Sequence, residues 1–107
     1  MKIELPNYHW FLSRHNGQFV TNTYSGSAGT LGDAGCLCTR TFHYRVYADI
    51  SSGNESEFRL IVESYIIQPW HLGGHQTDFE KVEFFCSEDC IAQAANWLSE
   101  VSGKYGF

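Results

Sequence analysis

The chain has 107 residues, which is enough to bury a core within one domain. Seven Lys and Arg residues against twelve Asp and Glu residues give a net charge of −5, and the basic residues are scattered. Because binding of a phosphate backbone needs clustered positive charge, this composition argues against direct nucleic-acid binding. An acidic surface instead suits a protein partner that is basic.

The N-terminal sequence gives an expectation about the compartment. Met-Lys-Ile-Glu-Leu-Pro lacks the apolar segment of a signal peptide, and no stretch reaches the length of a membrane span. We therefore expect a cytoplasmic protein that does not enter a membrane. Thiols stay reduced in the cytoplasm, so closely spaced cysteines there indicate metal binding or burial more than disulfides.

Two short runs of aromatic and β-branched residues, 8–14 and 18–24, open the chain. Between them lies the tripeptide His15-Asn16-Gly17, and Asn-Gly is a strong signal for a tight hairpin turn. We therefore predict an N-terminal β-hairpin. Residues 25–38 follow with four glycines among small polar residues, which predicts a long loop.

The middle of the chain alternates between apolar and polar residues with the period of a half-buried strand. This alternation covers residues 39–50 and 57–67, which a turn at Gly53-Asn54 separates. The two segments should form the central hairpin of a sheet. The side chains predicted to face the core are Phe42, Tyr44, Val46, Ala48, Ile50, Phe58, Leu60, Val62, Ser64 and Ile66.

The last third of the chain predicts a loop, a strand and a helix. Residues 68–78 contain two glycines and a proline, which indicates a second loop, and 79–85 follow as a weaker fifth strand. From Cys90 onward, apolar residues recur every three or four positions, as on one face of an amphipathic helix. Ser87 is the expected N-cap of this helix and Gly103 its expected end.

Strands followed by one closing helix predict an α+β fold. We expect an antiparallel sheet of four to five strands, built from β-hairpins, with one C-terminal α-helix packed on one face. Residues 1–107 should form a single domain. Aromatic residues make up 16% of the chain, so a core is available without cross-links.

Four cysteines form two close pairs, Cys36 with Cys38 and Cys86 with Cys90. Four thiolates supplied as two pairs are typical of a structural zinc site, so zinc is one prediction for a cofactor and no cofactor is the other. The spacings differ from the two-residue spacing of a zinc knuckle. Reduced structural thiols and disulfides are therefore the alternatives to a zinc-stabilised domain.

The cysteines also raise an enzyme hypothesis, because a thiol at a helix N-terminus has a lowered pKa. Cys86 and Cys90 lie near such a terminus, but the neighbouring Glu88 and Asp89 oppose thiolate formation. We therefore predict no catalytic residue. A small-molecule-binding protein or enzyme with a cleft between the 25–38 and 68–78 loops is the alternative reading.

The outward face of the central hairpin has the composition of a protein-binding surface, because aromatic residues and arginine are enriched at interfaces. The predicted function is a non-catalytic protein-interaction module, an adaptor or inhibitor of another macromolecule. Self-association into a homodimer would use the same surface, and burial within the chain is the competing interpretation. The residues predicted to make the contact are Tyr47, Arg59, Tyr65, Trp70 and His71.

Overall fold

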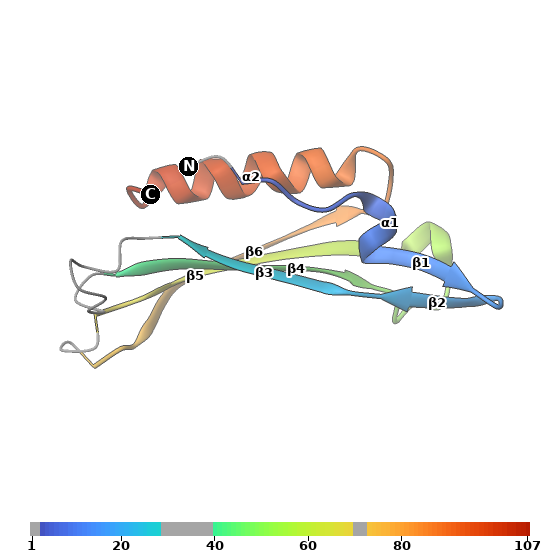
Figure 1. The fold of residues 1–107 in the computed structure, drawn as a ribbon, viewed down its shortest axis with the longest axis horizontal. Helices are drawn as coiled ribbons and strands as arrows, with labels where there is room; N and C mark the ends of the chain where they lie inside the picture. The colour runs from blue at the N-terminus through green and yellow to red at the C-terminus, as the bar shows by residue number, and fades with distance from the viewer. Residues whose placement is uncertain (1–2, 29–39, 70–72) are drawn as a thin grey trace.

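The computed structural model describes residues 3–28, 40–69 and 73–107 (Figure 1). It confirms the predicted α+β fold, in which antiparallel strands are followed by a C-terminal helix that packs on the sheet. The elements in chain order are α1 (Tyr8–Phe11), β1 (Leu12–His15), β2 (Gln18–Thr21), β3 (Thr23–Ala28), β4 (Thr41–Asp49), a 3-10 turn (Glu55–Glu57), β5 (Arg59–Ile67), β6 (Gln76–Phe85) and α2 (Cys90–Lys104).

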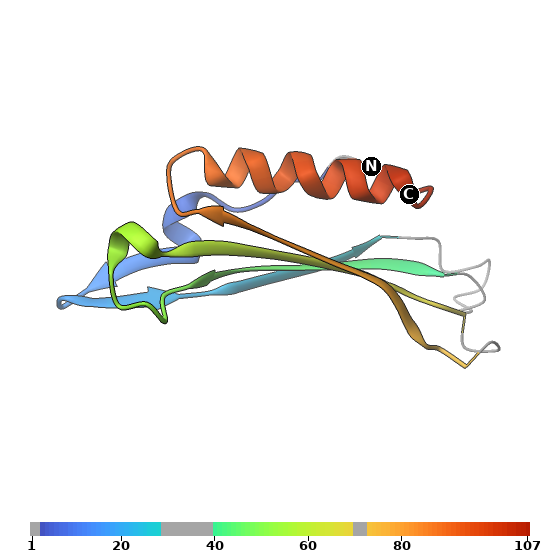
Figure 2. The same cartoon turned by 180° about the vertical axis from the view of Figure 1, so that it is seen from behind.

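The strands form two sheets. The four-stranded sheet has the order β3-β4-β5-β6 with antiparallel neighbours, and β1 pairs with β2 in a two-stranded hairpin. Figures 1 and 2 show that α2 runs along one face of the larger sheet, with the N-terminal segment beside it. Among the described residues, no helix or strand covers the opposite face (Figure 2).

The central pair β4 and β5 is paired over nine residues, from Thr41 opposite Ile67 to Asp49 opposite Arg59. Because side chains alternate along a strand, this register places the apolar members of both strands on the side of α2. The predicted assignment of faces is therefore correct for these two strands. Phe42, Val46, Leu60, Val62 and Ile66 are all fully buried.

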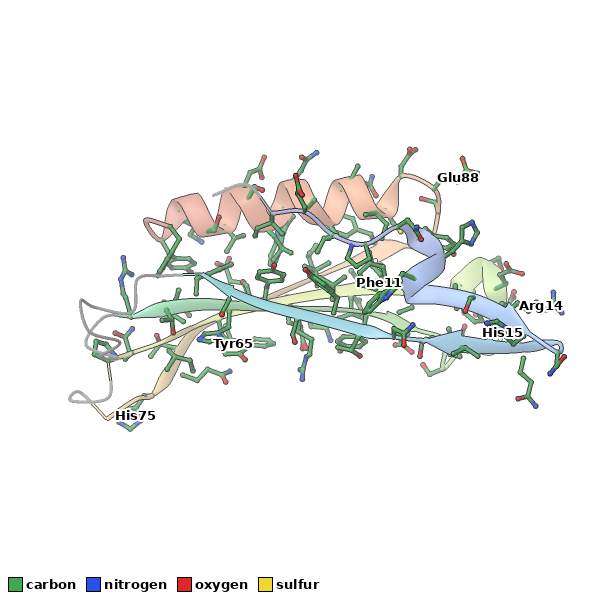
Figure 3. All side chains as sticks on the ribbon, viewed as in Figure 1. Phe11, Arg14, His15, Tyr65, His75 and Glu88 are labelled. Atoms are coloured by element: carbon green, nitrogen blue, oxygen red, sulfur yellow. The ribbon has the colours of Figure 1, made fainter. Side chains whose placement is uncertain are left out.

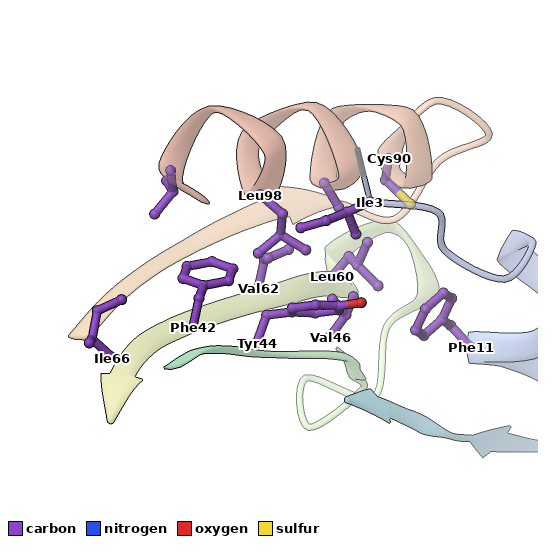
Figure 4. Packing of buried hydrophobic residues seen from close by; sticks show 12 residues of the cluster. Ile3, Phe11, Phe42, Tyr44, Val46, Leu60, Val62, Ile66, Cys90 and Leu98 are labelled. Carbon is purple, nitrogen blue, oxygen red and sulfur yellow. The ribbon is translucent and has the colours of Figure 1, made fainter. Parts of the chain in front are cut away.

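The core lies between α2 and this face of the sheet (Figure 4). Cys90, Ala94, Leu98 and Val101 recur every three or four residues along the helix and are buried. Helical spacing of this kind aligns side chains on one stripe, which here packs on the sheet. Ile3 of the N-terminal segment belongs to the same cluster, so the segment before α1 helps α2 to cover this face of the sheet.

The N-terminal hairpin differs from the prediction in its first strand. Residues 8–11 form a turn of helix, in which the side chain of Asn7 accepts a hydrogen bond from the Trp10 amide at 3.1 Å. This cap satisfies an amide that a helix start leaves free, and the turn buries Phe11 completely. Packing of Phe11 explains why a helical turn replaces the extended run expected from composition.

Strands of the structure extend into both predicted loops. Ser25 to Ala28 belong to β3 and pair with β4, and residues 29–38 of the predicted 25–38 loop lie outside the described residues. At Gly26, a side chain would collide with the ring of Tyr44, which explains the glycine there. Likewise, β6 begins at Gln76, three residues before the predicted strand.

Both ends of α2 differ slightly from the prediction. Asp89 is the N-cap and makes no side-chain capping bond, while the Ser87 carbonyl accepts from the Cys90 amide at 3.2 Å. At the other end the helix continues through Gly103 to Lys104, and Gly106 follows with a φ of 86°. Neither described helix is long and apolar enough to cross a membrane.

We predict that Leu98→Ala lowers the free energy of unfolding by about 2–5 kcal/mol, because it leaves a cavity where α2 meets the sheet. Asn96→Ala, an exposed position on the same helix, should change it by less than about 0.5 kcal/mol. Urea denaturation followed by circular dichroism measures both. Equal stability of the two variants would contradict the packing of α2.

Candidate functional site

The sheet face opposite α2 is the candidate site, and we call it the open face. Strand register defines it, because paired residues carry their side chains on the same side of a sheet. Figure 3 shows Tyr65 on this side. The open face consists of Thr23, Ser25 and Ser27 of β3, Thr41, His43, Arg45, Tyr47 and Asp49 of β4, Arg59, Ile61, Glu63, Tyr65 and Ile67 of β5, and Lys81, Glu83 and Phe85 of β6.

A row of charges crosses the middle of the open face. Arg45, Glu63 and Lys81 lie opposite one another on the three strands. Nη2 of Arg45 donates to Oε1 of Glu63 at 2.6 Å, and Nε donates to the same oxygen at 3.1 Å. The side chain of Glu63 is only 8% exposed whereas that of Arg45 is 53% exposed, so arginine shields a largely buried carboxylate. This pair raises the pKa of Arg45, first through the hydrogen bond to Glu63.

Next to the charged row lies an aromatic pair, His43 and Tyr65. Their rings are stacked with centroids 5.3 Å apart and an interplanar angle of 9°. Nε2 of His43 is 2.7 Å from the hydroxyl of Thr41. Burial lowers the pKa of His43, so the ring is neutral at pH 7 and stacks as an uncharged aromatic group. His43 and Tyr65 therefore form a stacked aromatic pair across β4 and β5 on the open face.

At the opposite end of the face, Arg59 lies over the ring of Phe85 with 3.8 Å between Cζ and the ring centroid. Phe85 is 61% exposed, which is unusual for so large an apolar side chain. The neighbouring Ile61 is only 2% exposed, although no described element covers this face. Long flanking side chains therefore close over Ile61, whereas Phe85 stays accessible, as does Phe79 of the same strand at 52% exposed.

The predicted contact residues divide into two groups. Tyr47, Arg59 and Tyr65 all lie on the open face, as expected. Trp70 and His71 lie outside the described residues, so their place relative to the face stays a prediction. Sequence reasoning missed Phe85, because Phe84 and Phe85 are adjacent and break the alternation of 79–85. Pairing with β5 would have identified it, since Phe85 stands opposite Arg59.

The predicted metal ligands are described only in part. Cys86 and Cys90 carry free thiols, whereas Cys36 and Cys38 lie outside the described residues. Within residues 3–28, 40–69 and 73–107, no three His, Cys, Asp or Glu side chains are grouped so that they could hold a metal ion. A zinc site made from all four cysteines stays a prediction.

Cys86, Cys90 and Tyr8 share a partly apolar environment at the start of α2. Burial raises the pKa of Cys86 to about 11 and that of Tyr8 to about 12, and the two side chains interact by a hydrogen bond. Burial also raises the pKa of Cys90, even though that residue begins the helix. Desolvation therefore outweighs the helix dipole here, and both thiols stay protonated at neutral pH. A thiolate nucleophile is disfavoured at this place.

The predicted cleft between residues 25–38 and 68–78 falls mostly on residues that the structure does not describe. A shallow hollow of about 440 Å³ does lie beside β3. It exists because the side chains of Ser25, Gly26 and Ser27 are small while their neighbours on β4 are large. The residues that line it are Ser25, Gly26, Ser27, His43, Tyr44, Arg45 and Tyr65.

The raised thiol pKa gives a measurable pH dependence. Alkylation of Cys86 by iodoacetamide should rise with a midpoint near pH 11 in the folded protein, because only the thiolate reacts. In the urea-unfolded protein the midpoint should lie near the ordinary value of 9.0. Peptide mapping by mass spectrometry separates Cys86 from the other cysteines. A folded-state midpoint at or below 9.0 would show an activated thiol and contradict the burial.

The ion pair on the open face predicts an asymmetry between two substitutions. Arg45→Ala should lower the free energy of unfolding, because it leaves the Glu63 carboxylate largely buried and without its partner. We expect a loss of about 1–2 kcal/mol, which lies between the typical effects of removing a surface ion pair and a buried one. Lys104→Ala removes the partner of the more exposed Glu80 and should have little effect. Thermal denaturation compares the two variants. A larger loss in Lys104→Ala would contradict the shielding of Glu63 by Arg45.

Comparison of the chain with protein-family models, curated proteins and solved structures finds no match. Function is therefore inferred from the chemistry of the chain itself. Three features of the structure bear on function. They are a sheet with one covered and one open face, two protonated thiols at the start of α2, and an edge strand of small residues.

Proposed function

We propose that this chain is a non-catalytic protein-interaction module that docks another macromolecule on its open face, as an adaptor or an inhibitor. The observation that carries the proposal is a sheet with a packed face and a second face that no described element covers, on which aromatic rings and arginines are gathered. Interfaces are enriched in these residue types, and a plain solvated sheet face is not.

One end of the open face supports this use. The guanidinium of Arg59 lies over the ring of Phe85, and the buried Ile61 of the same strand stands opposite Tyr47 of β4. A partner that covers Phe85 would remove an exposed ring from water, while the guanidinium of Arg59 keeps its contact with that ring. This arrangement favours Phe85, Arg59 and Tyr47 as the residues with the largest contribution to binding.

The charge distribution supports a basic partner. On the open face three basic residues balance three acidic ones, so the contact itself is close to neutral. The other described residues include eight acidic and only three basic side chains. Excess negative charge around a neutral contact surface attracts a basic protein over long distances without placing like charges in the interface. The open-face charges are Arg45, Arg59, Lys81, Asp49, Glu63 and Glu83.

Affinity capture tests this function with matched variants. The wild-type chain and Phe85→Ser are immobilised and exposed to lysate of the source cells, and each protein that the wild type captures is purified and its affinity measured. Phe85→Ser should weaken binding by at least about 30-fold, as loss of a hot spot does. Val20→Ser replaces an exposed apolar residue of β2, away from the open face, and should bind as the wild type does.

Two outcomes would contradict the proposal. One is a purified partner that binds Phe85→Ser and wild type equally well, because the contact would then lie elsewhere. The other is loss of binding in Val20→Ser alone, which would place the contact on the N-terminal hairpin. Circular dichroism of each variant verifies that the fold is intact before binding is measured.

A further inference from the structure

The sheet has two edges, and among the described residues no strand pairs with the outer side of β3. β3 pairs with β4 on one side only. On its other side, no backbone hydrogen bond links residues 23–28 to any other described part of the chain. Figure 1 views the molecule onto this edge and shows no element in front of it. A row of backbone donors and acceptors is therefore available for pairing with another strand.

The opposite edge, β6, has the features by which proteins prevent such pairing. A β-bulge interrupts its register opposite Tyr65, and Asp78 adopts a positive φ of 54° there. Lys81 and Glu83 place charges along the strand, and Lys104 of α2 reaches Glu80 with 3.2 Å between Nζ and Oε1. Bulges and charges discourage edge-to-edge pairing. The two edges of one sheet are thus protected unequally.

β3 has none of these protective features. Residues 23–28 contain no charged residue and no proline, and Thr23, Ser25 and Ser27 are exposed. In a chain of net charge −5, this is a neutral stretch along which a second acidic molecule can approach. Two copies of β6 placed edge to edge would instead bring several carboxylates together.

We propose that β3 is a homodimerisation edge, which pairs antiparallel with β3 of a second copy of this chain. In an antiparallel pair, two residues that stand opposite each other carry their side chains on the same face of the sheet. Each open-face residue of one copy must therefore stand opposite an open-face residue of the other copy. Ser25 lies on the open face and satisfies this condition when it stands opposite itself on the axis. The register then pairs Thr23 with Ser27 and Tyr24 with Gly26.

This register fits the side chains next to β3. Tyr24 stands opposite Gly26 of the second copy, and Gly26 has no side chain of its own but is covered by the ring of Tyr44. In each copy the rings of Tyr24 and Tyr44 are tilted together, with centroids 6.3 Å apart. In this register Tyr24 of one copy therefore meets Tyr44 of the other, and the aromatic row continues across the twofold axis.

The dimer leaves the open face free. A twofold axis perpendicular to the sheet joins two four-stranded sheets into one of eight strands, with both α2 helices on one side and both open faces on the other. In this register five residues of β3, 23–27, pair in each copy and span about 17 Å, which is a short contact. We therefore expect a weak dimer that presents two docking faces side by side.

Sedimentation velocity over a concentration series tests the proposal. The wild-type chain should pass from monomer to dimer as its concentration rises. Ser25→Lys places two like charges opposite each other on the axis and should raise the dissociation constant by at least about tenfold. Gln76→Lys adds the same charge to the exposed start of β6 and should leave the dissociation constant unchanged.

Charge reversal then identifies the register. Ser25→Glu alone should dimerise as poorly as Ser25→Lys, but an equimolar mixture of the two should form a heterodimer because opposite charges then face each other. A wild-type chain that stays monomeric at every accessible concentration would overturn the proposal. So would a dimer that Ser25→Lys leaves intact, or a mixture that fails to associate. Loss of partner binding in Phe85→Ser has no bearing on these results, so the two proposals succeed or fail separately.

Discussion

A helix of fifteen residues can cover only one face of a four-stranded sheet, and the rest of this structure depends on that limit. α2 packs over β5 and β6, and the N-terminal segment with Ile3 completes the cover. The opposite face has no such layer among the described residues. Side-chain pairs between neighbouring strands stabilise this face, above all Arg45 with Glu63 and Arg59 with Phe85. The same side chains therefore stabilise the sheet and form the candidate contact surface.

The sequence was sufficient to predict what depends on local periodicity. Alternation over β4 and β5 identified both faces of the sheet, and a three-to-four spacing identified α2. The sequence was insufficient where the local structure depends on contacts with residues that are distant in the sequence. Phe11 turns residues 8–11 into helix because it reaches the core, and Phe85 belongs to the open face because β6 pairs with β5 in one register. Neither fact is visible in a window of neighbouring residues.

The two cysteines at the start of α2 illustrate how environment outweighs position. A helix N-terminus lowers a thiol pKa, yet burial raises the pKa of both Cys86 and Cys90. Cys86 and Cys90 lie near Tyr8 of the N-terminal segment, and all three residues pack against the core under α2. A thiolate nucleophile is therefore disfavoured at these positions at neutral pH.

Hydroxyl-radical footprinting of the isolated chain tests the two-faced sheet most directly, because oxidation of a side chain reports its contact with water. Phe85 should be oxidised rapidly, whereas Phe42 on the face under α2 should stay protected until the protein unfolds. Both residues are phenylalanines of the same sheet, so intrinsic reactivity cancels in the comparison. Protection of Phe85 together with rapid oxidation of Phe42 would contradict the assignment of packed and open faces.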